Sequence, residues 1–350
     1  MAVAQAKLDA LAARLAGLSF DPASAVRAAR AEAVSRLSAM GLPSRRDEYW
    51  RYTDPSSLVA PVAASAAVYD DAADAALFSA LDSVKLVFVD GVFDAAQSSD
   101  LTLEGVSIER LADAKTEIHW AQDLYGQLEA RGQTPVERPL AALNSAFATD
   151  GALIRVTQKA TKPVLIVYQK KSETSDAMLH HCIKLEAGAE ITVLEAGALA
   201  ARGNSVIEVD VADGARFHPI RAQGRDHNRR SLTHVFARIG KNAGFKSFTM
   251  TANGVLTRNE AVLELLGNDS TAHVAGTALG EGDFHHDDTV FITHAAERCE
   301  SRQVFKKVLK NGAIGVFQGK ILVKQGAQKT DGYQISQALL LDGDSQFLAK

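Results

Sequence analysis

The densest cluster of side chains in this sequence that could bind a metal lies in one short segment, Phe284–Ser301. Its potential ligands are imidazoles, carboxylates and one thiol: His285, His286, Asp287, Asp288, His294, Glu297, Cys299 and Glu300. Because side chains alternate along a strand, His286, Asp288 and His294 are expected on one face. Nitrogen, oxygen and sulfur donors in this mixture suit zinc or iron.

The same segment also fits a polar turn beside a strand, with its His and Asp side chains bonded to the backbone. Its spacing matches no compact metal motif, such as two histidines four residues apart on a helix. We therefore favour a structural or interface role and assign no catalytic, cofactor-binding or metal-binding residue. The candidates for a metal site are His285, His286, His294 and Cys299.

The chain has only two cysteines, Cys182 and Cys299. This number excludes a disulfide framework and a zinc site built from four cysteines. Cys299 could act as a nucleophile or a sulfur acceptor, but a lone cysteine is more often a small buried apolar residue. Cys182 follows His180 and His181 in a strand-like run, so at least one of these histidines is expected in the core or on the surface.

Three common motifs do not occur in the sequence: the phosphate-binding GxxxxGK[ST], the nucleophile elbow GxSxG and the Rossmann glycine set. Gly280–Gly282 is read as a loop, because it lacks the spacing of a phosphate cradle. The residues alone therefore predict no complete active site.

Composition narrows the class of protein. A chain of 350 residues fits one large domain or two ordinary ones. Its 38 basic and 42 acidic residues give a net charge of −4, which argues against a polyanion binder that acts through bulk charge. No run approaches the roughly eighteen apolar residues of a membrane-spanning helix. Lys7, Asp9 and Arg14 interrupt any signal-peptide core, so a cytoplasmic location is expected.

Helical patterns begin the chain. Leu8, Leu11, Leu15 and Leu18 fall on one stripe of a first helix. Asp21–Pro22 is a start signal for a second helix from about Ala23 to Met40, which Gly41 ends.

Shorter elements follow. We expect a short helix over about Ala72–Leu81, a strand pair over Lys85–Phe93 joined at Asp90–Gly91, and a helix over Arg138–Thr149. Residues 97–137 are weakly patterned.

After Asp150–Gly151 the pattern changes to about fifteen short apolar runs separated by Gly, Asn or Asp turns, typical of a sandwich, a barrel or a solenoid. Runs such as Val164–Tyr168 and Ala261–Leu266 are apolar with little alternation, as in strands covered on both faces. Glycines recur at the expected corners. We therefore favour a parallel β-helix over a β-sandwich.

Four ordered motifs resemble the SufB/SufD family of iron–sulfur cluster assembly proteins, and the resemblance spans nearly the whole chain. The first is Gly41–Thr53, in which a Gly-Leu-Pro turn precedes Arg, Glu, Trp, Tyr and Thr. The others are Leu143–Phe147 with Asp150–Gly151, the run from His285 to Lys306, and Asn311–Lys320 followed by Gln328–Gln334.

The resemblance implies a helical or mixed N-terminal region, taken as residues 1–138, and a right-handed parallel β-helix core at 139–350. It also implies a non-ATPase scaffold subunit of a SufBCD-type complex that supports cluster formation and iron acquisition, with a SufB-like subunit and a SufC-like ABC ATPase as partners. No tightly bound cofactor is expected in the isolated chain, and an iron–sulfur cluster is expected only transiently in the complex. No nucleic acid or membrane partner is expected.

The family's C-terminal helical domain, with its Cys-Ser-His motif and its ATPase contacts, is expected after Lys350. We therefore expect either a fragment or a naturally short subunit, whose open sheet edge would favour a homodimer.

Two other classes of function remain open: a stand-alone metal-binding β-helix protein, and a β-helix enzyme that acts on polysaccharide. The amino-terminal motif is predicted to be structural. Trp50 and Tyr52 should pack the helical region onto the β-helix, and Glu48 should pair with Arg45 or Arg46.

Overall fold

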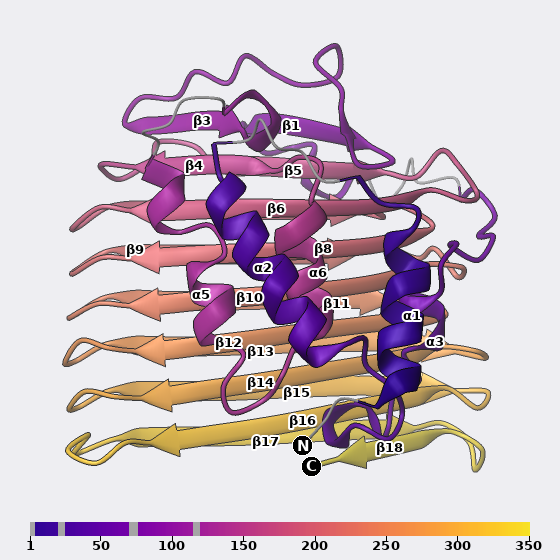
Figure 1. The fold of residues 1–350 in the computed structure, drawn as a ribbon. Helices are drawn as coiled ribbons and strands as arrows, with labels where there is room; N and C mark the ends of the chain where they lie inside the picture. Colours follow the sequence, from indigo (N-terminus) through magenta and orange to yellow (C-terminus); the bar gives the residue numbers. More distant parts are fainter. Residues whose placement is uncertain (1–3, 20–24, 70–75, 115–119) are drawn as a thin grey trace.

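Two nine-stranded β-sheets are the largest part of the molecule (Figure 1). The computed structural model describes residues 4–19, 25–69, 76–114 and 120–350. Sheet A has the order β17-β15-β13-β11-β9-β7-β5-β1-β2, and sheet B has the order β18-β16-β14-β12-β10-β8-β6-β4-β3.

The strands of sheet A are β1 Val84–Val89, β2 Val92–Phe93, β5 Val164–Gln169, β7 Glu190–Gly197, β9 Arg216–Gln223, β11 Gly244–Ala252, β13 Thr271–Glu281, β15 Glu300–Lys310 and β17 Asp331–Leu340. Those of sheet B are β3 Val106–Arg110, β4 Ala152–Val156, β6 Asp176–Leu185, β8 Arg202–Val211, β10 Arg230–Ile239, β12 Leu256–Leu265, β14 His285–His294, β16 Ile314–Val323 and β18 Gln346–Ala349. From β4 onward the chain alternates between the sheets, and neighbours within each sheet are parallel. This is a β-solenoid of about seven turns, which confirms the predicted β-helix.

The helices are α1 Gln5–Leu15, α2 Arg27–Met40, α3 Ser56–Val59, α5 Gln127–Arg131 and α6 Pro139–Phe147, with 3-10 turns at Glu48–Trp50, Ala76–Phe78, Leu111–Asp113 and Trp120–Asp123. The two predicted N-terminal helices are present, although the expected start of the second lies partly in residues 20–24, outside the described residues. Gly41 ends α2 with a φ of 64°, a conformation that glycine adopts without strain. Of the short helix predicted over Ala72–Leu81, the described part contains only the 3-10 turn at Ala76–Phe78.

The predicted strand pair is confirmed as the antiparallel β1–β2 hairpin. Asp90 and Gly91 have φ values of 48° and 82°, so both central residues take the left-handed conformation that a tight hairpin turn needs. β1 also pairs in parallel with β5, and β3 pairs with β4. Residues before 139 therefore build the first rung of both sheets.

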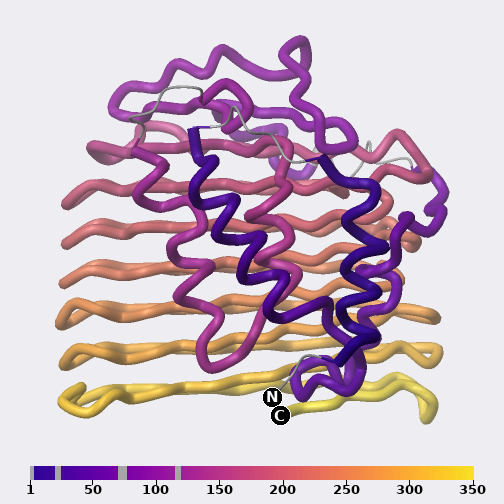
Figure 2. The backbone as a smooth tube through the Cα atoms, viewed as in Figure 1, coloured from indigo at the N-terminus to yellow at the C-terminus, as the bar shows by residue number. Residues whose placement is uncertain are grey.

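Apolar side chains of the two sheets fill the solenoid interior. A second apolar cluster joins helices α2 and α6 to the outer face of sheet B, with Leu37, Leu143, Met178 and Leu232 among its members. The helices α5 and α6 contact β8, and α2 lies on α6 (Figure 2). The helical region is thus packed along one face of the solenoid.

Candidate functional site

The structure separates the predicted cluster on β14 into two environments. His285 and Asp287 point to the outer face of sheet B, and His286 and Asp288 point into the solenoid. This alternation is what a strand imposes. His294 lies at the end of β14, where its Nε2 is 2.8 Å from Ser301 Oγ.

Cys299 lies in the corner that follows β14, buried beside the Ser270 hydroxyl, with Sγ and Oγ 3.3 Å apart. The candidates His285, His286, His294 and Cys299 therefore have separate partners. The structure does not bring them together as one ligand set.

His286 belongs to a buried network around Lys307 of β15. The Lys307 ammonium donates to His286 Nδ1 at 2.7 Å, to Asp288 Oδ2 at 2.8 Å and to the Val316 carbonyl at 2.9 Å. Burial, with the Lys307 charge, lowers the pKa of His286 well below its usual value, so the ring is neutral. His286 Nδ1 accepts a hydrogen bond from the Lys307 ammonium. The other ring nitrogen, Nε2, lies 3.1 Å from Thr251 Oγ1. Both nitrogens of this ring are thus engaged by protein groups.

Asp287 holds the amino-terminal motif against sheet B. Thr53 donates its hydroxyl to Asp287 Oδ2 at 2.6 Å, and Arg258 forms an ion pair with the same carboxylate. The Arg258 guanidinium also donates to the Tyr49 carbonyl at 2.8 Å and lies 4.1 Å from the centre of the Trp50 ring. Arg258 is fully buried, so its charge depends on these contacts.

Trp50 is 4% exposed and packs in the cluster that joins the helices to sheet B. Tyr52 is half-buried, with the Arg51 guanidinium 6.0 Å from its ring centre. Glu48 pairs with Lys350. In place of the expected pairing with Arg45 or Arg46, Glu48 therefore contacts the residue that follows β18, because the motif docks beside the last turns of the solenoid.

A second polar group lies inside the solenoid between β5, β6, β7 and β9. The Tyr168 hydroxyl donates to Glu195 Oε2 at 3.0 Å and lies 3.1 Å from His181 Nε2, and Arg221 donates to Glu195 Oε1 at 2.7 Å. Burial lowers the pKa of His181 to about 4 and raises that of Tyr168 well above its usual value. At neutral pH the ion pair is therefore the charged part of this group.

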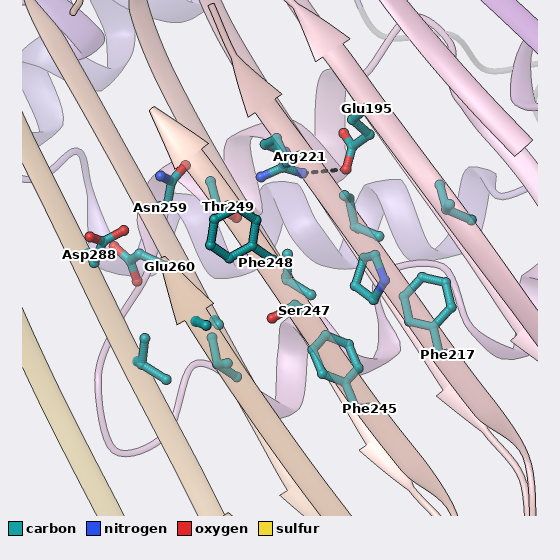
Figure 3. Close-up of a pocket in the computed structure, with 18 of the residues that line it drawn as sticks. Glu195, Phe217, Arg221, Phe245, Ser247, Phe248, Thr249, Asn259, Glu260 and Asp288 are labelled. Atoms are coloured by element: carbon teal, nitrogen blue, oxygen red, sulfur yellow. Dashed lines mark hydrogen bonds and ion pairs between the residues drawn. The ribbon is translucent and has the colours of Figure 1, made fainter. Parts of the chain in front are cut away.

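An internal cavity of about 60 Å³ separates this group from the Lys307 network (Figure 3). Arg221 and Glu195 border it on one side, and Asn259 and Asp288 border it on the other. Pro219 also lines it, and the pairing between β9 and β11 skips that residue, as expected where a strand residue lacks an N–H. The volume is sufficient for a few water molecules.

The described residues contain one group of three side chains with ligand atoms close enough for a metal: His180, Cys182 and Glu208, whose donor atoms lie within 4.8 Å of one another. All three are fully buried beneath α5 and α6. The sequence pointed to His180 and Cys182 through their adjacency in a strand-like run. Glu208 carried no such signal, because its position opposite Cys182 depends on strand register.

The ligand atoms of His180 and Glu208 are already hydrogen-bonded to protein groups. His180 Nε2 is 2.8 Å from Glu208 Oε2, and His180 Nδ1 is 3.1 Å from Asn144 Oδ1. Glu208 also accepts the backbone N–H groups of Gly126 and of Glu129, the latter at 2.8 Å. Burial raises the pKa of the Cys182 thiol well above its usual value, which disfavours the thiolate that binds metals. The donor set therefore serves to anchor α5, and a metal would have to displace these bonds.

The fold and the order of its parts define a class of protein. Residues 15–166 match the family described as SufBD protein N-terminal region, and residues 167–350 match SUF system FeS cluster assembly, SufBD core domain. The chain belongs to the SufBD family, which functions in iron–sulfur cluster assembly.

Among its relatives, the iron–sulfur cluster assembly protein SufD of Escherichia coli is 27% identical over 325 residues, 88% of this chain and 72% of the relative. A SufBD family protein of Synechocystis is 24% identical over 92% of this chain and 74% of its own length. SufD of Bacillus subtilis is 24% identical over 59% of this chain and 49% of its own length. In the described part of the chain, none of the helices has the length and hydropathy required to cross a membrane.

Proposed function

We propose that this chain is a scaffold subunit of a SufBCD-type complex, without ATPase activity of its own, that supports cluster formation and iron acquisition. The observation that carries the proposal is that both SufBD family regions match, in order, across residues 15–350. The iron–sulfur cluster is the cargo of this system, held transiently in the complex, and no catalytic residue is assigned to the chain.

The partners proposed from the family are a SufB-like subunit and a SufC-like ABC ATPase, in the cytoplasm, with a homodimer as the form of the isolated chain. Residues 1–138 are proposed as the N-terminal region and 139–350 as the β-helix core. The docking of Glu48–Thr53 onto sheet B supports a rigid arrangement of the two, since buried Asp287 and Arg258 bind that segment directly.

Co-expression with the SufB-like and SufC-like proteins of the same organism tests the proposal. An affinity tag on this chain should recover both partners. The purified complex should assemble a cluster under anaerobic conditions with ferrous iron, a sulfur donor and ATP, followed by the visible absorbance of the iron–sulfur cluster. Failure to recover the SufB-like subunit, or equal assembly with this chain omitted, would contradict the proposal.

One observation favours a second function, a stand-alone metal-binding protein: the grouping of His180, Cys182 and Glu208. Metal analysis of the isolated chain after anaerobic purification separates the two. Stoichiometric zinc or iron that is lost in Cys182→Ser and retained in Cys299→Ser would favour the metal-binding protein. A metal content far below one per chain agrees with the scaffold.

A further inference from the structure

The outer face of sheet A carries an apolar row that crosses the strands. The register places Ile220 beside Phe248, Phe248 beside Ala275, Ala275 beside Val304, and Val304 beside Ile335. We call these five residues the apolar row. Helices α3, α5 and α6 pack on sheet B, and in the described part of the chain no helix packs on the outer face of β11, β13, β15 or β17.

The row is covered at one end and open at the other. Leu165 and Leu194, which continue it toward β5, are buried, with Phe78 packed against them. Phe248 is 42% exposed, and Met250, two residues further along the same face of β11, is also exposed. Exposed apolar side chains that adjoin one another in this way mark an interaction site.

Basic side chains flank the open part of the row. Lys246 lies two residues before Phe248 on β11, and Lys306 lies two residues after Val304 on β15. Neither lysine forms an ion pair with any described residue. Carboxylates of this face, in contrast, form ion pairs with other residues: Glu300 pairs with Arg302, and Glu281 pairs with Lys310. This face therefore has unpaired positive charge, although the whole chain has a net charge of −4.

We propose that the apolar row binds an amphipathic helix of a partner protein, with acidic residues on both sides of its apolar stripe. Strands in a sheet are about 4.8 Å apart and a helix advances about 5.4 Å per turn, so a helix laid across the strands places one apolar side chain over each rung. The opposite sheet offers an internal precedent: Leu140, Leu143 and Phe147 of α6 pack across Met178 and Leu232 of sheet B. Acidic flanks would complement Lys246 and Lys306. The proposal does not depend on the partners named above.

A synthetic peptide provides the first test. The probe is an amphipathic helix of about 14 residues, roughly 21 Å long, with Leu at alternating third and fourth positions and Glu on both flanks. Its control carries Lys in place of Glu. Fluorescence anisotropy should show binding of the Glu peptide to the full chain, and about tenfold or more weaker binding to Phe248→Asp and to Lys246→Glu/Lys306→Glu. Val62→Asp, which changes an exposed apolar residue elsewhere, should bind as the unchanged protein does.

Equal affinity for both peptides, binding that persists in Phe248→Asp, or no binding of the Glu peptide would overturn the proposal. Binding to vesicles of anionic phospholipid that is lost in the same variants would instead assign the face to a membrane. A photo-crosslinking residue at position 248, used in cells, gives an independent measurement. The crosslinked peptide should map to an acidic amphipathic helix of another protein. A crosslinked peptide that comes from a second copy of this chain, or the absence of any crosslink, would overturn the proposal.

Discussion

His286 and Asp287 are neighbours in the chain, yet they act in different parts of the molecule. His286 lies inside the solenoid against Lys307, and Asp287 lies beneath the helical region against Arg258 and Thr53. Each side chain has protein partners that satisfy it, which favours a structural role for both. Because side chains alternate along β14, these two residues lie on opposite faces of sheet B and do not act together as ligands.

The first prediction concerns the histidines of β14. His286→Ala/His294→Ala should lower the free energy of unfolding by about 1–3 kcal/mol, because Lys307 and Ser301 lose partners. Cluster assembly by the intact complex should be retained, measured by cluster absorbance per folded chain. The milder pair His286→Asn/His294→Asn keeps polar groups at both positions and serves if the alanine variant is poorly folded. Loss of assembly in a folded variant would contradict the structural role.

The second prediction is a loss of stability in mild acid. Burial lowers the pKa of His181 and of His234 to about 4, from an ordinary value of 6.5. Between pH 6.5 and 4 the unfolded chain binds protons that the native chain does not bind. Stability should therefore fall as pH falls through this window, by up to about 3 kcal/mol per histidine.

Glu260 extends the loss to lower pH. Burial, the largest single effect, favours the protonated form, but the neighbouring charges, led by Arg258, and the Arg258 hydrogen bond together outweigh burial and hold the pKa of Glu260 at about 2. The stability it contributes is complete above about pH 4.5 and is lost as pH falls toward 2.

Urea unfolding midpoints from pH 7 to 4 provide the measurement for the histidines. His181→Gln should flatten the profile and the exposed-site control His227→Gln should not; identical profiles would count against burial as the cause.

At the scale of elements, single polar side chains fix the helices on sheet B. Asn144 of α6 donates to the Leu179 carbonyl at 3.0 Å and to the Asn204 carbonyl at 2.8 Å, between β6 and β8. Glu208 of β8 accepts two backbone N–H groups of the α5 segment. Apolar packing supplies the area of this interface, and these bonds set its register.

Asn144→Ala should lower the free energy of unfolding by about 2–3 kcal/mol, because two buried carbonyls and the His180 ring lose their partner. Ser35→Ala on the exposed side of α2 is the matched control and should change stability by less than about 0.5 kcal/mol. Chemical denaturation measures both. An equal effect of the two substitutions would show that α6 is held by packing alone.

Trp50→Ala should lower the free energy of unfolding by about 3–5 kcal/mol, more than Asn144→Ala does. The substitution opens a cavity and removes the ring beside the buried Arg258 guanidinium. Tyr52→Ala removes a half-buried ring from the same motif and should lower the free energy of unfolding clearly less than Trp50→Ala does. Thermal unfolding of the two variants provides the comparison. An unchanged midpoint for Trp50→Ala would contradict the packing role of the motif.

For the whole molecule, the helical region and the solenoid share their first rung. β1 and β3 cover the edges of β5 and β4, and the N-terminal helices cover sheet B. A boundary at residue 139 therefore cuts paired strands and an apolar interface.

Residues 139–350 expressed alone should aggregate or unfold at a much lower urea concentration than the full chain. Size-exclusion chromatography and circular dichroism measure the difference. A control chain that lacks only residues 1–3 should behave as the full chain does. A monomeric 139–350 fragment with an unchanged unfolding midpoint would contradict a shared first rung.

The sequence by itself determined the class of fold. Helical periodicity located α1, α2 and α6, Asp90–Gly91 located the hairpin, and short apolar runs between glycine corners predicted the solenoid. These are local signals, since a helix, a turn and a strand each depend on residues close in sequence. The ordered motifs, such as Gly41–Thr53, also predicted the family.

The tertiary structure alone decided which residues meet. Glu48 pairs with Lys350, Asp287 with Arg258, and His286 with Lys307, across separations that no local pattern encodes. In a solenoid these contacts depend on register, and a shift of one residue would turn each side chain to the opposite face. The apolar row on sheet A likewise exists only because five strands align Ile220, Phe248, Ala275, Val304 and Ile335.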